Sequence, residues 1–348
     1  MPTEVMRVSA DDLNQAAFQR AKAVLAVDGL VAFPTETVYG LGANAFSAAA
    51  VARIFTAKGR PANNPLIVHV ADVAGVERVA TEWPANAARL AERFWPGPLT
   101  LVLPKRAEVP DAVTGGGPTV AVRVPAHPVA LALLRTSGLP LAAPSANRSS
   151  QVSPTQAAHV LRSLEGRIDL ILDGGPTSGG IESTIIDVTT EPPRLLRPGL
   201  ITTAQVEAVI GSLERPVTMV KTSAPLPAPG MLERHYAPRA PLECVSEAGM
   251  SRAAELCGSG LRVGWVKLAP KDQVGRPNQI TPLVAGLDAG LNMLVVEMPL
   301  DPTAYSAQIY ATLHELDDAG VDRILVDWPP ETDDWLAVRD RLRRAATQ

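Results

Sequence analysis

Apolar and polar positions follow a helical period and then a strand-like run, and this order repeats along the first two-thirds of the chain. Apolar residues recur at helical spacing over 13–25, and Gly29 follows as a stop signal. The apolar run 30–33 predicts a short buried strand, and 47–58 predicts a helix closed by Gly59. Further strands are expected near 66–70, 99–103, 120–124, 168–172 and 183–188. The pattern therefore predicts an α/β domain.

Two capping boxes mark the later part of this domain. Ser153-Pro154-Thr155-Gln156 predicts a helix start with Ser153 as the capping residue and proline at the first helical position. A second box at Thr202–Gln205 predicts a helix that ends at Gly211. We therefore expect the first domain to span 1–211.

A proline-rich stretch separates this domain from the rest of the chain. The prolines at 216, 225, 227, 229, 238 and 241 make 212–241 a stiff, extended linker. Strands are then expected at 242–245, 262–266, 293–298 and 323–327, with helices between them. The region 242–348 is thus predicted to be a small doubly wound, Rossmann-like α/β domain.

Composition narrows the class of protein. A chain of 348 residues with 46% hydrophobic residues can bury two cores, and its net charge of -4 argues against coating nucleic acid by bulk electrostatics. Cys244 and Cys257 form no CxxC pair, so a disulfide scaffold or structural zinc is not expected. No apolar run approaches the roughly 20 residues of a membrane span. We expect a cytoplasmic protein without a membrane segment.

Familiar nucleotide and hydrolase signatures fit poorly. The sequence holds no GxxxxGK[ST], HExxH or GxSxG string. Residues 40–45 match GxGxxA, but Lys58 and Arg60 occupy the region where a dinucleotide fold needs an acidic residue. We interpret Gly40 and Gly42 as tight-turn residues.

Cations and hydroxyls lie in polar loops at the ends of the expected elements. Lys58 and Arg60 follow a helix, where they either answer its negative end or, held by Pro61, present a pair of cations to a phosphate or carboxylate. Ser145, Asn147 and Ser153 lie between a strand and a helix start, a position that favours an anion. For Ser153, simple helix capping is the alternative.

Three further features permit a structural or a functional interpretation. Arg123 alternates in an expected strand, so a buried guanidinium there needs a carboxylate partner from the protein or from a ligand. His69 ends an apolar strand and is either a structural histidine or a ligand contact. The glycine pairs at 174–175 and 179–180 predict either a hairpin-like loop or close approach of the backbone to a ligand.

Taken together, the strings FPTETVYGLGANA (33–45), KGRPANNPLIVHV (58–70), WPGPLT (95–100), VAVRVPAHP (120–128), APSAN (143–147) and ESTIID (182–187) resemble the YrdC/Sua5 family, the threonylcarbamoyl-AMP synthases. APGMLERHYAPRAPL (228–242) resembles the linker of the two-domain Sua5 branch, whereas the C-terminal domain matches only in position and length. The resemblance implies a YrdC-like twisted mixed sheet with helices and a large concave pocket.

The resemblance also implies a reaction. L-threonine, bicarbonate or carbon dioxide, and ATP would give L-threonylcarbamoyladenylate and pyrophosphate, with Mg²⁺ bridging the phosphates. The product would pass to a separate tRNA threonylcarbamoyl transferase complex that modifies adenosine 37 of tRNAs. Direct contact of this chain with tRNA, if any, is expected to be weak.

The family's functional residues fall on matching positions of this sequence. Lys58 and Arg60 would be catalytic, by offsetting charge on the phosphates. The implied ATP contacts are Lys58, Arg60, Ala62, Thr119, Ser145, Asn147, Ser153, Arg197, His235 and Tyr236. The implied L-threonine contacts are Thr35, His69, Arg123, Ala143 and Ser183. The linker, with its His-Tyr pair, would act as a lid over the nucleotide.

Two other functions stay open from the residues alone. A binder of double-stranded RNA or tRNA could use a basic pocket, and it would show salt-dependent RNA affinity without pyrophosphate release. A transferase that uses carbamoyl phosphate is the second alternative, because the KGRP and SAN strings separate these chemistries poorly.

Overall fold

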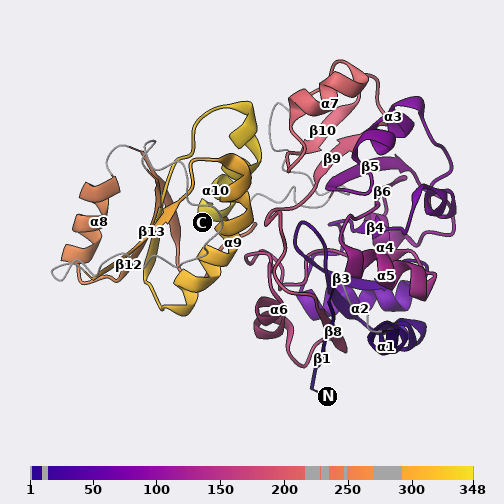
Figure 1. The fold of residues 1–348 in the computed structure, drawn as a ribbon, viewed down its shortest axis with the longest axis horizontal. Helices are drawn as coiled ribbons and strands as arrows, with labels where there is room; N and C mark the ends of the chain where they lie inside the picture. Colours follow the sequence, from indigo (N-terminus) through magenta and orange to yellow (C-terminus); the bar gives the residue numbers. More distant parts are fainter. Residues whose placement is uncertain are drawn as a thin grey trace. The chain divides into compact units, whose positions relative to one another are not determined.

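A computed structural model describes residues 2–9, 15–215, 228, 235–246, 249–269 and 292–347 (Figure 1). The chain forms two compact units. The first consists of residues 1–149 and 153–232, and the second of residues 150–152 and 233–348. None of the helices in the described parts is long and apolar enough to cross a membrane.

The first unit is built on a ten-stranded mixed sheet with the order β1-β8-β2-β3-β7-β4-β6-β5-β9-β10. The sheet contains both parallel pairs, such as β4 with β6, and antiparallel pairs, such as β2 with β3. The strands are β1 (Glu4–Arg7), β2 (Val31–Pro34), β3 (Tyr39–Asn44), β4 (Ile67–His69), β5 (Leu99–Pro104), β6 (Thr119–Arg123), β7 (Leu141–Ala142), β8 (Leu170–Asp173), β9 (Thr184–Asp187) and β10 (Arg194–Arg197).

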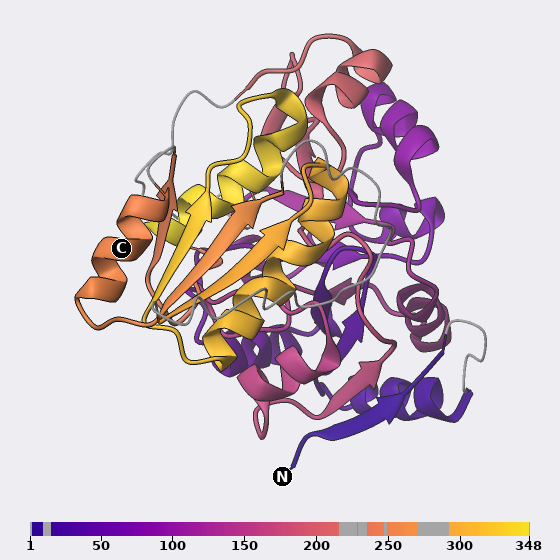
Figure 2. The same ribbon diagram turned by 60° about the vertical axis from the view of Figure 1, so that its left-hand side comes forward.

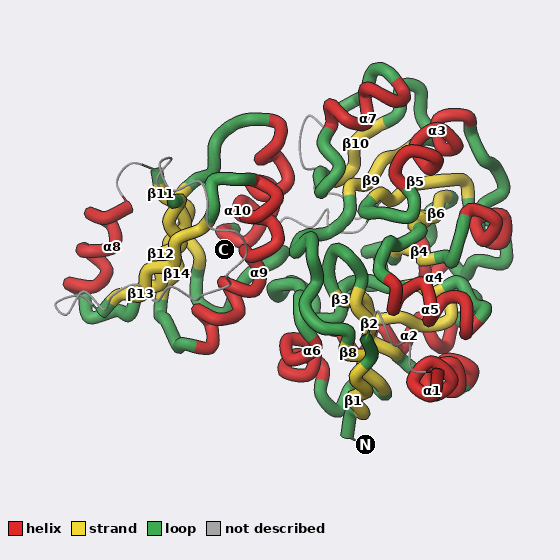
Figure 3. The backbone as a smooth tube through the Cα atoms, in the orientation of Figure 1, coloured by secondary structure: helices red, strands yellow, loops and turns green. Residues whose placement is uncertain are grey.

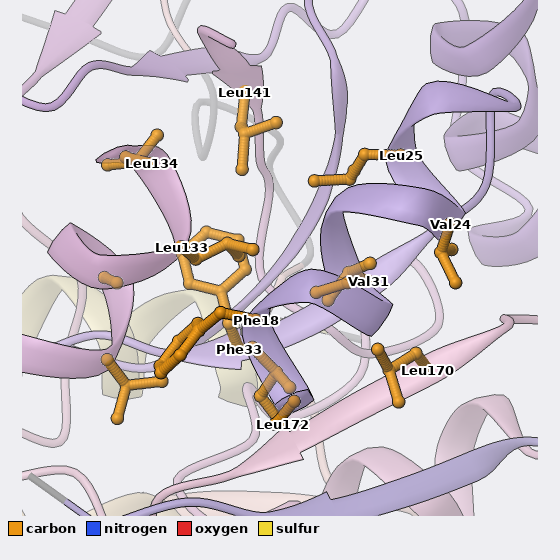
Figure 4. Packing of buried hydrophobic residues seen from close by; sticks show 14 of the residues in the cluster. Phe18, Val24, Leu25, Val31, Phe33, Leu133, Leu134, Leu141, Leu170 and Leu172 are labelled. Atoms are coloured by element: carbon orange, nitrogen blue, oxygen red, sulfur yellow. The ribbon is translucent and has the colours of Figure 1, made fainter. Parts of the chain in front are cut away.

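Helices cover this sheet and supply its core. They are α1 (Gln15–Ala26), α2 (Ala48–Lys58), α3 (Ala85–Phe94), α4 (Asp111–Thr114), α5 (Pro128–Ser137), α6 (Ala157–Leu164) and α7 (Thr203–Ile210), with a 3-10 turn at Val73–Arg78. Phe18 and Leu25 of α1 pack with Leu133 of α5 against Phe33 and Leu172 of the sheet (Figure 4). This apolar layer fixes β2 and β8, and with them the loop that follows β2.

Two of the helices predicted in the first unit, at 47–58 and after Thr202, are confirmed with their terminal signals. Ser47 accepts a hydrogen bond from the Ala50 amide at the start of α2, and Gly59 ends α2 with a left-handed φ of 61°. Thr202 and Gln205 form a reciprocal capping box at the start of α7. The capping bonds at these boundaries join residues within a few positions of one another.

The predicted helix start at Ser153 is wrong. Helix α6 begins at Ala157, with Gln156 as its N-cap residue. The Ser153 hydroxyl instead donates a 2.6 Å hydrogen bond to Glu182, a residue 29 positions away. The Ser153 side chain thus hydrogen-bonds to a carboxylate that is distant in sequence, instead of capping the helix that follows it.

The interpretation of Gly40 and Gly42 as tight-turn residues is wrong, and of the two alternatives for the glycine pairs at 174–180 the hairpin-like loop is excluded. Gly40 and Gly42 lie inside strand β3, not in a tight turn, and a Cβ at Gly42 would come within 2.8 Å of the Phe33 ring. The glycines at 174–180 do not close a hairpin, because β8 pairs with β1 and β2 whereas β9 pairs with β5 and β10. Gly42, Gly174 and Gly179 allow neighbouring groups to approach closely, whereas Gly175 and Gly180 adopt left-handed φ angles of 81° and 74°.

The second unit is a four-stranded parallel sheet with the order β11-β14-β12-β13. Its strands are β11 (Leu242–Val245), β12 (Val263–Leu268), β13 (Met293–Met298) and β14 (Arg323–Asp327), and its helices are α8 (Gly249–Gly258), α9 (Pro302–Asp318) and α10 (Leu336–Ala346), with a 3-10 turn at Asp333–Trp335. Figure 2 shows the arrows of β12, β13 and β14 side by side, and Figure 3 shows α8 on one side of the sheet with α9 and α10 on the other.

The predicted fold class, a large mixed sheet followed by a smaller parallel α/β sheet, is confirmed. The predicted linker over 212–241 lies mostly outside the described residues, which include only 212–215, 228 and 235–241 of it.

Candidate active site

Arg123 is the last residue of β6, and its guanidinium is buried with its partners already in place. Its Nη2 atom lies 2.7 Å from a carboxylate oxygen of Glu36, its Nη1 atom donates to the Thr37 hydroxyl at 3.0 Å, and its Nε atom donates to the Gly97 carbonyl. The sequence-based prediction that a buried Arg123 needs a carboxylate is confirmed, with Glu36 as the protein partner.

A chain of hydroxyls holds Arg123 in this orientation. Because the Thr35 hydroxyl donates to the Val38 carbonyl at 2.7 Å, Thr37 is the donor in the 2.8 Å bond between the two threonine hydroxyls. Thr37 is then free to accept from Arg123. The loop between β2 and β3 therefore reaches across the intervening strands and fixes the guanidinium at the end of β6.

His69 lies beside Arg123, since the parallel register of β4 and β6 pairs these two residues. Burial, with a further contribution from the Arg123 charge, lowers the pKa of His69 to about 3. The imidazole is therefore neutral at neutral pH. Its Nδ1 atom is buried and has no hydrogen-bond partner among the residues that the structure describes.

Lys58 is the last residue of α2, but its amine hydrogen-bonds to carbonyls of another segment. Its amine donates to the carbonyls of Ser145, at 2.7 Å, and of Asn147. Burial, and then repulsion by Arg60, holds the pKa of Lys58 well below its usual value. The Lys58 carbonyl in turn accepts from the Ser149 amide, so the end of α2 and the 145–149 loop are fixed together.

Arg60 and the APSAN loop complete this group of residues. The Arg60 guanidinium donates to the Asn64 side chain at 2.6 Å and to the Pro65 carbonyl at 2.7 Å. Ala143 donates its amide to the Ile67 carbonyl, and Ser145 forms an isolated bridge with Gly40 of β3. The cations and the loop therefore meet near the amino end of β4.

A third group surrounds the start of β9. The Ser183 hydroxyl lies 2.7 Å from that of Thr100 and accepts from Arg197 at 3.1 Å, and the Arg197 Nε atom donates to the Ser183 carbonyl. Ser153 and Glu182 pair next to it. This cluster brings together three residues that the resemblance assigns to two different ligands.

The remaining predicted residues are more scattered. Thr119 begins β6, and extending the β4–β6 register places it opposite Pro65, near Arg60. Ala62 is exposed. His235 and Tyr236 belong to the second unit, where the Tyr236 ring stacks on Tyr310 and lies under the Arg341 guanidinium.

The first unit thus holds two polar groups toward opposite ends of the same strands. Arg123 and His69 lie at the carboxyl ends of β6 and β4, whereas Lys58, Arg60 and Thr119 lie at or near the amino ends. The five residues of β6 span four residue-to-residue steps, so its two ends lie about 13 Å apart. That span suits a ligand pair with an acidic group at one end and phosphates at the other.

Three residues with roles in this arrangement were missed by sequence reasoning: Glu36, Thr37 and Glu182. A signal for the first existed, because a buried Arg123 demands a carboxylate and Glu36 lies in the PTETVYG string. The Ser153–Glu182 pair offers no comparable signal, since nothing local joins residues 29 positions apart.

Comparisons with known proteins agree with this architecture. The family model Sua5_yciO_yrdC, described as telomere recombination, matches residues 23–199, and a model for the C-terminal domain of threonylcarbamoyl-AMP synthase matches 201–347. Threonylcarbamoyl-AMP synthases of Pyrococcus abyssi and Bacillus subtilis are 45% and 43% identical to the chain, over 91% and 96% of it and over 90% and 94% of their own lengths.

A solved structure of P. abyssi Sua5 complexed with L-threonine superposes with a TM-score of 0.87 at 41% identity, covering 99% of this chain and 98% of that one. These matches define the class of the protein as a transferase of the nucleotidyltransferase type. More specifically, the chain belongs to the YrdC/Sua5 family, in its two-domain form.

Proposed function

We propose that this chain joins L-threonine, bicarbonate or carbon dioxide, and ATP into L-threonylcarbamoyladenylate, with release of pyrophosphate. The observation that carries the proposal is the pair of buried groups in the first unit: Arg123 with hydroxyls at one end of β6, and Lys58 and Arg60 near the other. The related P. abyssi protein, solved with L-threonine, supports an amino acid as one substrate.

The amino acid would bind at the end of β6. Arg123 would hold its carboxylate, and the neutral His69 and Ser183 would lie beside it. Ala143, whose amide donates to the Ile67 carbonyl at the amino end of β4, would contact the amino acid from the side of the cations. Thr35 would act through the hydroxyl chain that orients Arg123, because its own hydroxyl is engaged by Val38. The pocket would thus be formed before substrate arrives.

The nucleotide would lie along Lys58, Arg60, Ser145 and Asn147, with Thr119, Ser153 and Arg197 as further contacts. Lys58 and Arg60 would offset the charge that builds on the α-phosphate and the leaving pyrophosphate. Catalysis would then rest on positioning and electrostatics, without a covalent enzyme intermediate. Ala62 would contribute its backbone, since its side chain is a single exposed methyl group.

Magnesium would enter with the nucleotide. Within the described residues, no group of three or more histidine, cysteine or acidic side chains could hold a metal ion. Mg²⁺ is commonly held by substrate phosphates and water with one or two carboxylates, and such a site needs no preformed cage. The ion would neutralise phosphate charge together with Lys58 and Arg60.

The carbamate formed from the amino group is unstable in water, so the site must exclude solvent before adenylation. We propose that the linker performs this task, as the resemblance implies. The product would be consumed by a separate tRNA threonylcarbamoyl transferase complex.

The proposal is tested by omitting one component at a time from an assay of pyrophosphate release. We expect release to require ATP, bicarbonate and L-threonine together. Release that needs ATP but not threonine would overturn the assignment of the amino acid. If carbamoyl phosphate can replace bicarbonate in this assay, the chain is the competing carbamoyl transferase. If the chain binds RNA with an affinity that falls with salt and releases no pyrophosphate, it is an RNA-binding protein.

A further inference from the structure

Glu36 is held at one position by its main chain. Its carbonyl accepts a 2.7 Å hydrogen bond from the Gly179 amide and a 3.4 Å bond from the Ser178 hydroxyl. A Cβ at residue 179 would come within 2.8 Å of that carbonyl oxygen. Glycine at 179 therefore allows the loop before β9 to close on the β2–β3 loop, and this contact fixes where the Glu36 side chain begins.

The Glu36 carboxylate has unused acceptor capacity. Both of its oxygens are buried, and neither accepts a hydrogen bond from any group in the described parts of the chain, although one lies 2.7 Å from Arg123 Nη2. A carboxylate can accept about four hydrogen bonds, and leaving a buried anion without donors is costly. Glu36 can therefore accept a hydrogen bond from a donor group of a ligand.

Among the residues that the structure describes, no neighbouring titratable group donates a hydrogen bond to Glu36. Burial lowers the pKa of His127, although the Glu36 charge acts in the opposite direction, and the His127 Nδ1 atom accepts from the Val129 amide. His69 is neutral, because burial and Arg123 lower its pKa to about 3. Arg123 is thus the one cation that the described contacts place beside Glu36, and its Nη1 and Nε atoms already donate elsewhere.

Arg123 and Glu36 together form a buried pair with one positive and one negative end. A ligand that satisfies both ends carries a negative group and a cationic donor on adjacent atoms. An α-amino acid zwitterion has this pattern, whereas a hydroxy acid carries a neutral hydroxyl instead of a cationic donor. The pair therefore suits an amino acid over its analogue without the amine.

We infer that Glu36 binds the ammonium group of the amino acid whose carboxylate Arg123 holds, and that it accepts a proton from that group. The inference rests on the proposed function and deepens it. An N–H bond of the ammonium breaks, an O–H bond forms on Glu36, and the electron pair stays on nitrogen. The product is a neutral amine beside a protonated carboxyl group, and this amine is the nucleophile that carbamate formation requires.

The test compares calorimetric binding of L-threonine and of (R)-3-hydroxybutanoate, which keeps the carboxylate and hydroxyl but lacks the amine. Glu36→Gln should weaken threonine binding roughly 10- to 100-fold, the loss of one charge-assisted hydrogen bond, and leave hydroxybutanoate binding unchanged. Glu36→Asp keeps the charge and should recover part of the loss. Glu214→Gln, which removes a surface partner of Arg194, is the matched control and should bind both ligands as wild type does.

A kinetic measurement tests the proton transfer separately. In Glu36→Gln, pyrophosphate release at subsaturating threonine should rise close to tenfold per pH unit below the pKa of the free amine, because solvent must then remove the proton. In wild type the same profile should be flatter. Equal pH profiles in the two proteins would overturn the role in proton transfer.

Three binding results would overturn the inference. An equal loss of both ligands would mean that Glu36 only orients Arg123. Tighter threonine binding in Glu36→Gln would mean that Glu36 competes for Arg123, and unchanged threonine binding would mean that the ammonium lies elsewhere. Failure of wild type to bind threonine would instead overturn the proposed function, so the two failures are distinguishable.

Discussion

The two units treat buried basic side chains differently. In the second unit, the buried Arg341 and Arg344 each pair with Asp340 of the same helix α10. In the first unit, Lys58 reaches across to two main-chain carbonyls of another segment, and its pKa is lowered by burial and by Arg60. The first arrangement stabilises a helix locally, whereas the second holds a cation that gains from an incoming anion.

Replacement of Lys58 should produce the largest functional effect. Lys58→Met keeps the length of the side chain but removes the amine, and we expect kcat for pyrophosphate release to fall at least about 100-fold, as for removal of one electrostatic contact in a transition state. The melting temperature should change little. The reason is that a lysine with a lowered folded pKa costs stability at neutral pH, and its removal offsets the two lost hydrogen bonds.

The matched control is Lys22→Met on the exposed face of α1, which should leave both kcat and melting temperature unchanged. If the activity of Lys58→Met is within a factor of about ten of wild type, Lys58 does not bind the phosphates. The buried cations of the two units would then not differ in function.

Replacement of Asp327, at the end of β14 in the second unit, should lower stability without changing ligand binding, the reverse of the result expected for Lys58. The Asp327 carboxylate accepts from the Trp265 indole at 2.8 Å and from the Leu268 amide at 3.1 Å. Asp327→Ala leaves these donors without their acceptor, so we expect a loss of about 1–3 kcal/mol in the unfolding free energy, measured by denaturant titration. The affinity for L-threonine should stay at the wild-type value, and a change in it would contradict the separation of roles.

Sequence reasoning succeeded where a signal is local. The cap at Ser47, the left-handed Gly59 and the box at Thr202 each depend on neighbours within a few residues, and the structure contains all three. The strands of the second unit were found for a similar reason, because parallel strands buried on both faces appear as continuous apolar runs.

It failed where distant segments decide the outcome. Strand β3 was missed because Gly40 and Gly42 resemble a turn, whereas the Phe33 ring that requires small residues there comes from another strand. Ser153 resembles a cap until Glu182 is placed beside it. The need of Arg123 for a carboxylate could be predicted from its burial, but its pairing with Glu36 depends on how the β2–β3 loop crosses the sheet.

The smallest effect we predict concerns pH and His69. Its pKa is about 6.5 in the unfolded chain and about 3 in the folded protein, where burial is the main cause. Between pH 6.5 and pH 3, His69 is protonated in the unfolded state but not in the folded state. The unfolding free energy is therefore independent of His69 titration above about pH 6.5 and decreases as the pH falls below it. His69 should contribute at most about 1.4 kcal/mol per pH unit to this loss. His69→Gln, followed by denaturant titration from pH 8 to pH 4.5, should therefore show a flatter slope than wild type below pH 6.5 and the same slope above it. A parallel decline in both proteins would mean that His69 is hydrated or protonated in the native state, and the polar end of β4 would then resemble an ordinary surface.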